Sequence, residues 1–139
     1  MYIEWPTLKA KVRANLLEDK APRVCSAFKK ILPFQSIQEH TMISGEGLYC
    51  AAPLRITFMD YMVSRKQGDI YFFNPGQLVV IVYGQTTEPL KVNKFAEVRR
   101  DDLAILSQVG KAVWANTLKP ILPTSGDDGR QIIPVVFSE

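Results

Sequence analysis

The sequence predicts a mainly β domain of the α+β type, in which antiparallel strands close into a barrel covered by two α-helices. First, the apolar residues between Ile37 and Ile132 fall mostly in short runs of strand length, separated by turn residues such as Asn74-Pro75-Gly76. Second, the run Leu78–Tyr83 is apolar throughout, as expected of a central strand buried on both faces. Third, two stretches repeat apolar residues at helical spacing. So many consecutive strands hide their edges best by closing, which favours a barrel over an open sheet with both helices on one face.

The first strand and the first helix are predicted from residues 8 to 33. Residues 8–16 alternate strictly between apolar and polar, which indicates a strand with one face in the core. Asp19 and Pro22 mark the start of a helix, and Pro33 ends it. The apolar stripe of this helix comprises Val24, Phe28, Ile31 and Leu32.

The remaining elements follow from turn signals and periodicity. Two runs flank Gly45 and Gly47 and favour a hairpin. Asp101 and Asp102 open a second helix, in which Gly110 allows close backbone approach. The predicted strands are Ile37–Ile43, Leu48–Ala52, Arg55–Met62, Ile70–Phe73, Leu78–Tyr83, Phe95–Val98 and Ile132–Phe137, and the stripe of the second helix comprises Leu103, Leu106, Gly110, Val113 and Trp114.

Length and charge limit the number of domains and the classes of partner that are expected. The 139 residues are the size of one domain, so a single domain over residues 1–139 is expected. The net charge is +3 and the basic residues are scattered, which argues against nucleic acid as a partner. No apolar run reaches the length of a membrane span and no secretory signal pattern is visible, so a cytoplasmic protein without a membrane partner is expected.

Neither a metal site nor a cofactor is expected. Cys25 and Cys50 form no C-x-x-C pair, and the chain holds a single histidine, so a zinc site lacks ligands. Both cysteines are interpreted as buried free thiols. The glycine-containing stretches "SGEG" and "SGDDG" are not phosphate loops, because neither opens a helix.

The stretch "HTMISGEGLYC" holds the candidate catalytic residues His40, Ser44 and Glu46. A histidine titrates near neutrality and can act as general acid or base; Ser44 would orient a substrate or act as nucleophile, and Glu46 would orient the imidazole. If Gly45-Glu46 forms a two-residue turn, Tyr49 shares a face with His40, and a longer loop removes it. The alternative is a hydrogen-bonded strand histidine, a turn serine and a solvated glutamate.

Four stretches carry a resemblance to known proteins. "LLEDKAPRVCSAFKKILPF" resembles the opening of cyclophilins, and "HTMISGEGLYCA", "FFNPGQLVVIVYG" and "NKFAEV" resemble a bacterial group of small cyclophilin-like proteins of unknown function. The resemblance covers roughly residues 8–137 through the order and spacing of these motifs. It implies a closed, eight-stranded antiparallel cyclophilin-like β-barrel capped by two α-helices.

The same resemblance implies further site residues. Tyr83, Asn93 and Phe95 match the group and, with Tyr49, are expected to bind a ligand at the mouth of the barrel. The alternative is a tyrosine that caps the core, a loop asparagine and a core phenylalanine. The adjacent aromatics Tyr71, Phe72 and Phe73 must point to opposite sides of a strand, which favours a homo-oligomer.

These observations lead to a functional hypothesis with alternatives. The chain is predicted to bind a small polar metabolite at one end of the barrel and to transform it by hydrolysis or proton transfer. Prolyl isomerases of the cyclophilin family use an Arg after the first helix, and the stretch from Phe34 to Ala52 contains none. A peptidyl-prolyl isomerase and a non-catalytic binding or assembly module remain alternatives, and the sequence leaves open whether the chain is an enzyme.

Overall fold

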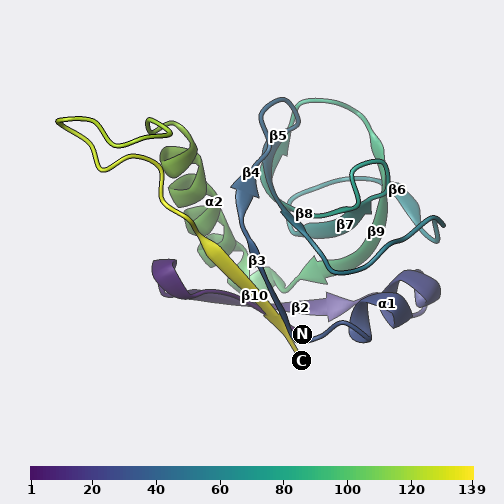
Figure 1. The fold of residues 1–139 in the computed structure, drawn as a ribbon. Helices are drawn as coiled ribbons and strands as arrows, with labels where there is room; N and C mark the ends of the chain where they lie inside the picture. The colour runs from purple at the N-terminus through teal and green to yellow at the C-terminus, as the bar shows by residue number, and fades with distance from the viewer.

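The computed structural model describes all residues from Met1 to Glu139. Ten strands form one antiparallel sheet that curls into a nearly closed barrel, accompanied by two α-helices (Figure 1). The strands are β1 (Tyr2–Trp5), β2 (Ala10–Leu16), β3 (Phe34–Ile37), β4 (Glu39–His40), β5 (Gly45–Ala51), β6 (Met62–Ser64), β7 (Asp69–Phe73), β8 (Leu78–Thr86), β9 (Lys91–Val98) and β10 (Pro134–Ser138). The helices are α1 (Pro22–Lys29) and α2 (Leu103–Thr117), with short 3₁₀ turns η1 (Pro6–Leu8) and η2 (Arg100–Asp102).

One stretch of chain brings the two ends of the sheet together. The strands follow the order β3-β10-β1-β2-β9-β7-β8-β5-β4, and β6 pairs with β9 beside this path. Since β3 and β4 are consecutive in the chain, residues 34–40 pair with β10 on one side and with β5 on the other. This path has nine strands, so it has eight if β3 and β4 are counted together and β6 is left aside. The predicted barrel class is therefore confirmed, although the chain forms ten strand segments.

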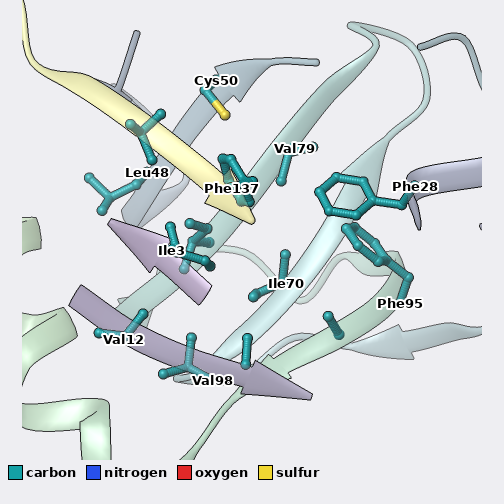
Figure 2. Close-up of a cluster of buried hydrophobic side chains, with 14 of the residues drawn as sticks. Ile3, Val12, Phe28, Leu48, Cys50, Ile70, Val79, Phe95, Val98 and Phe137 are labelled. Atoms are coloured by element: carbon teal, nitrogen blue, oxygen red, sulfur yellow. The ribbon is translucent and has the colours of Figure 1, made fainter. Parts of the chain in front are cut away.

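Buried side chains fill the interior of the barrel. Strand alternation sends Val12 and Ala14 of β2 inward, while Lys11 stays exposed. Figure 2 shows Ile3, Leu48 and Val79 pointing into the same interior from different strands. Aromatic rings fill one end, where Phe28 and Phe95 have centroids 4.8 Å apart.

The two helices lie on opposite sides of the barrel (Figure 1). Helix α1 begins at Pro22, as predicted, and packs Phe28 into the core. Its first free N–H groups, from Arg23 and Val24, donate to the carboxylate of Asp60 at 2.7 and 3.1 Å, so the cap comes from a distant loop. Helix α2 packs on β2, β4, β5 and β8. Neither helix has the length and apolarity that crossing a bilayer requires.

The strand predicted at Arg55–Met62 is wrong, because most of this segment is irregular. Side chains, rather than a neighbouring strand, satisfy its backbone. Gln77 accepts from the N–H of Ile56 at 2.8 Å, and Asn74 donates to the carbonyl of Phe58 at 3.1 Å. Apolar and β-branched residues favour a strand only where a partner edge is available, and here amide side chains occupy that place.

Candidate functional site

His40 ends β4 at the point where the barrel meets α2. The residue is 6% exposed, and both imidazole nitrogens are hydrogen-bonded. Nδ1 lies 2.6 Å from the carbonyl oxygen of Thr41, and Nε2 lies 2.8 Å from the hydroxyl oxygen of Tyr83. A carbonyl only accepts, so Nδ1 carries the proton and donates it. In the neutral ring, Nε2 is then an acceptor and the Tyr83 hydroxyl donates to it.

The surroundings keep both groups neutral near pH 7. Burial lowers the pKa of His40 below its usual 6.5, while the Thr41 carbonyl and the charge of Glu46 act in the opposite direction. Burial also raises the pKa of the Tyr83 hydroxyl above its usual 10. A neutral imidazole whose Nε2 accepts from the Tyr83 hydroxyl can take up that hydroxyl proton while the Tyr83 oxygen takes another proton in its place. This is the geometry of a general base that acts through a hydroxyl relay.

Two glycines make room for this arrangement. A Cβ on Gly110 would overlap the ring of Tyr83, so the glycine lets that ring lie against α2. A Cβ on Gly84 would overlap the carboxylate of Glu46 in the same way. Glu46 lies along β8 and its Oε2 accepts from the N–H of Gln85 at 2.6 Å. The close approach expected at Gly110 is therefore confirmed, and it serves Tyr83.

A pocket of about 250 Å³ opens beside these side chains. The ring of Trp114 forms one wall, with its centroid 4.5 Å from that of His40. Met42 and Ile43, both exposed, form the outer rim. The other lining residues are Thr41, Gly45, Glu46, Tyr83 and Thr87. The pocket thus combines an aromatic wall with one imidazole, one phenol and one carboxylate, a combination suited to a small molecule with both a ring and a polar group.

The hairpin that carries the candidate residues has a loop longer than two residues. Glu39 pairs with Tyr49, His40 pairs with Leu48, and the N–H of Thr41 donates to the carbonyl of Gly47 at 2.9 Å. Since directly opposite residues share a face, His40 lies with Leu48, and Tyr49 lies on the other face with Glu39. This is the outcome that a longer loop implies.

The structure brings some of the candidate residues together and separates others. His40, Glu46 and Tyr83 line one pocket. Ser44 and Tyr49 line a second pocket, on the outer wall of the barrel. The orienting contact to the imidazole comes from the Thr41 carbonyl, because neither nitrogen of His40 bonds to Glu46.

Asn93 and Phe95 lie outside the His40 pocket. The side chain of Asn93 accepts from the N–H of Asp60 and donates to the carbonyl of Phe58, both at 3.1 Å, and so holds the irregular segment before β6. Phe95 is fully buried against Phe28 of α1. Both residues therefore have packing partners within the fold.

Sequence reasoning missed Trp114 and Thr41 as parts of the site. Trp114 was assigned to the core stripe of the second helix, and its position four residues after Gly110 was the available signal. On a helix such residues are neighbours, so the glycine that admits Tyr83 stands next to the indole that lines the pocket. Thr41 acts through its backbone carbonyl, for which a sequence gives no signal.

The two cysteines, Cys25 and Cys50, lie buried in the core. The prediction of buried free thiols is confirmed. Burial raises the pKa of Cys25 to about 11 and that of Cys50 to about 12, so both thiols stay protonated and unreactive near neutrality. No three His, Cys, Asp or Glu side chains lie close enough together to hold a metal ion.

Comparisons with known proteins give a family and a fold. Residues 5–118 match a family described as "Protein of unknown function (DUF3830)". The structure of McbB in complex with tryptophan aligns with a TM-score of 0.82 and 24% identity; the alignment covers 97% of this chain but only 43% of the McbB chain. The solution structure of the hypothetical protein AF2241 from Archaeoglobus fulgidus aligns with a TM-score of 0.59 and 15% identity, covering 99% of this chain and 91% of that one. No curated protein matches the sequence. At these identities the two structures share the fold alone.

Proposed function

Because the chain belongs to the DUF3830 family of proteins of unknown function, we propose a function from its own site: it binds a small molecule in the His40 pocket and moves a proton through the Tyr83–His40 pair. The observation that carries this proposal is the hydrogen-bond chain from Tyr83 to His40 to the Thr41 carbonyl, set in the wall of a pocket. A buried histidine that served packing alone would not need a pocket beside it.

The walls of the pocket suggest the chemical class of the ligand. Trp114 offers a flat apolar surface, and Glu46 would attract a cationic group such as a protonated amine. A small molecule with an aromatic ring and an amino group meets both requirements. McbB, which shares the fold, has been captured with tryptophan, so aromatic amino acids are suitable first probes for this chain.

The proton would move in two linked steps. The Tyr83 oxygen takes a proton from the ligand, or from a water that attacks it, as the Tyr83 hydroxyl proton passes to Nε2 of His40. The imidazolium that forms keeps its Nδ1–H on the Thr41 carbonyl, and the charge of Glu46 favours it. Water attack would give hydrolysis, and direct proton removal would give an isomerisation or elimination. A nucleophilic role for Ser44 receives no support from its place on the outer wall.

Other parts of the functional hypothesis remain predictions from the sequence. They are the cyclophilin-like kinship of the barrel, a bacterial origin, a cytoplasmic location and a homo-oligomer. Prolyl isomerisation and a purely binding or assembly role remain the rivals. A proline-peptide isomerisation assay separates the first rival, since the His40 pocket gives no reason for a rate gain there.

The test follows His40 and Trp114 by NMR during titration with L-tryptophan, L-phenylalanine and indole. We expect at least one of these probes to shift the imidazole and indole signals, and Trp114→Ala to weaken its binding about tenfold through loss of the aromatic wall. Ser44→Ala is the matched control, since it changes the same loop outside the pocket. If no probe perturbs either ring at millimolar concentration, or if Ser44→Ala weakens binding as much as Trp114→Ala does, the proposed site is wrong.

A further inference from the structure

We propose a second binding site, on the outer wall of the barrel, that takes a small apolar carboxylic acid. A pocket of about 320 Å³ lies over β5, β7 and β8, on the far side of the 41–44 loop from His40. Thr41 and Ile43 contribute to both pockets. The outer pocket is lined mainly by apolar and aromatic side chains, among them Tyr49, Tyr71, Phe73, Leu78, Val80 and Leu90.

One buried cation, Arg65, lies among these apolar side chains. The side chain of Arg65 is 3% exposed, and its Nη1 donates to the hydroxyl of Tyr71 at 3.1 Å. The contacts of Nη2 with the carbonyls of Ser44 and Glu88 are long, at 3.4 and 3.5 Å. The Nε–H is buried and has no hydrogen-bond partner. Burial of a charged donor without a partner is unfavourable, so the free chain leaves part of this guanidinium unsatisfied.

The counterion of Arg65 is also incomplete. Its carboxylate partner is Glu88, which lies on the loop between β8 and β9, is 40% exposed, and approaches Nη2 at 3.1 Å. Lys94, another buried cation of the barrel, is satisfied differently. Its ammonium group lies 2.7 Å from the buried carboxylate of Asp69 and 2.8 Å from Glu97. Lys94 would keep the buried carboxylate of Asp69 if its half-exposed partner Glu97 moved away, whereas the half-exposed Glu88 is the sole carboxylate partner of Arg65, and a ligand can displace it.

The geometry of a guanidinium indicates which ligand would complete it. A carboxylate binds side-on to Nε–H and one Nη–H through two parallel hydrogen bonds. A ligand carboxylate in this position would take the unpaired Nε–H and replace Glu88 at Nη2. The rest of the ligand would then pack on Tyr49 and Tyr71, which favours a monocarboxylate with an aromatic or branched aliphatic body.

The test compares 3-phenylpropionate with its neutral amide, 3-phenylpropanamide, and follows the Nε–H signal of Arg65 by NMR. We expect the acid to shift that signal and the amide to bind about tenfold more weakly, because the amide cannot form the charged pair. Equal binding of the two probes would overturn the proposal. A shift of the His40 ring without a shift at Arg65 would also overturn it, and would place the acid in the other pocket.

Two variants sharpen the result. Glu88→Gln removes the competing carboxylate from an exposed position, so 3-phenylpropionate should bind several-fold more tightly; unchanged or weaker binding counts against the site. Arg65→Gln should abolish binding, with Arg55→Gln, at an exposed arginine, as the matched control. If Arg65→Gln fails to fold, Glu88→Gln and the acid–amide pair still decide the question. The His40 pocket is tested independently, since none of these variants touches it.

Discussion

At the scale of single residues, the backbone carbonyl of Thr41 decides the chemistry of His40. Because Nδ1 must donate to that carbonyl, Nε2 is left to accept from Tyr83, and the ring is neutral with a fixed tautomer. The sequence pointed to His40 and Tyr83 but not to their contact, since 42 intervening residues and three strands separate them along the chain. Only the register of β4 against β5 and of β5 against β8 brings them together.

The buried neutral state of His40 predicts a dependence of stability on pH. The folded pKa lies below 6.5, whereas in the unfolded chain it is about 6.5. As the pH falls below about 6.5, the unfolded chain binds a proton that the folded chain refuses, so the free energy of unfolding decreases. His40→Asn removes this contribution, and its stability should change less between pH 7.5 and pH 5.5. Urea unfolding at three pH values measures how the free energy of unfolding changes with pH in the parent and in His40→Asn. Equal changes in the two proteins would show that His40 is not held neutral by the fold.

At the scale of elements, the most reliable predictions rested on a clear pattern of apolar residues or on a residue that marks where an element begins. The apolar run Leu78–Tyr83 lies within β8, and Pro22 begins α1. The short strand β1 was not predicted, because four residues are too few to show a period. The strand predicted at residues 55–62 was wrong for a different reason. Their composition is that of a strand, but no strand edge was left for them to pair with.

The fit of α2 against the barrel predicts that Gly110→Ala is destabilising. Alanine favours a helix over glycine by about 1 kcal/mol, so the substitution would help an isolated helix. Here the added Cβ meets the ring of Tyr83, and overpacking of this kind costs about 1–3 kcal/mol. Chemical unfolding should therefore show a net loss of stability. Gly126→Ala is the control, since its Cβ would meet nothing within 4 Å. A Gly110→Ala variant as stable as the parent would mean that Tyr83 moves freely, and that His40 does not depend on its position.

At the scale of the whole molecule, the barrel closes through a single stretch of seven residues, from Phe34 to His40. The sequence predicted closure from the number of strands, but not the strand that would perform it. The sequence predicted only a hairpin strand at Ile37–Ile43, which overlaps the end of this stretch, because pairing with β10 involves a segment about a hundred residues away. The functional site depends on this closure, since the same stretch that pairs β3 with β10 also carries β4, which places His40 against α2.

Gln38 joins the two halves of this closing stretch, and its loss should open the barrel locally. Its N–H donates to Ile133, its Nε2 donates to the carbonyl of Tyr49, and its Oε1 accepts from the indole of Trp5, all within 2.9 Å. Gln38→Leu would leave the buried indole N–H of Trp5 without its partner, at a cost of about 1–3 kcal/mol.

Gln35→Leu is the matched control for this prediction, because Gln35 belongs to the same stretch and its side chain faces solvent. Hydrogen exchange should accelerate at the β4–β5 pairing in Gln38→Leu and stay near the parent rate in Gln35→Leu, since only the first change removes a contact across the seam. The His40 and Tyr83 signals should broaden or shift in the same variant, because the strand that positions the imidazole loosens. If Gln38→Leu loses no more stability than Gln35→Leu, closure rests on the backbone ladder alone, and the site does not depend on this side chain.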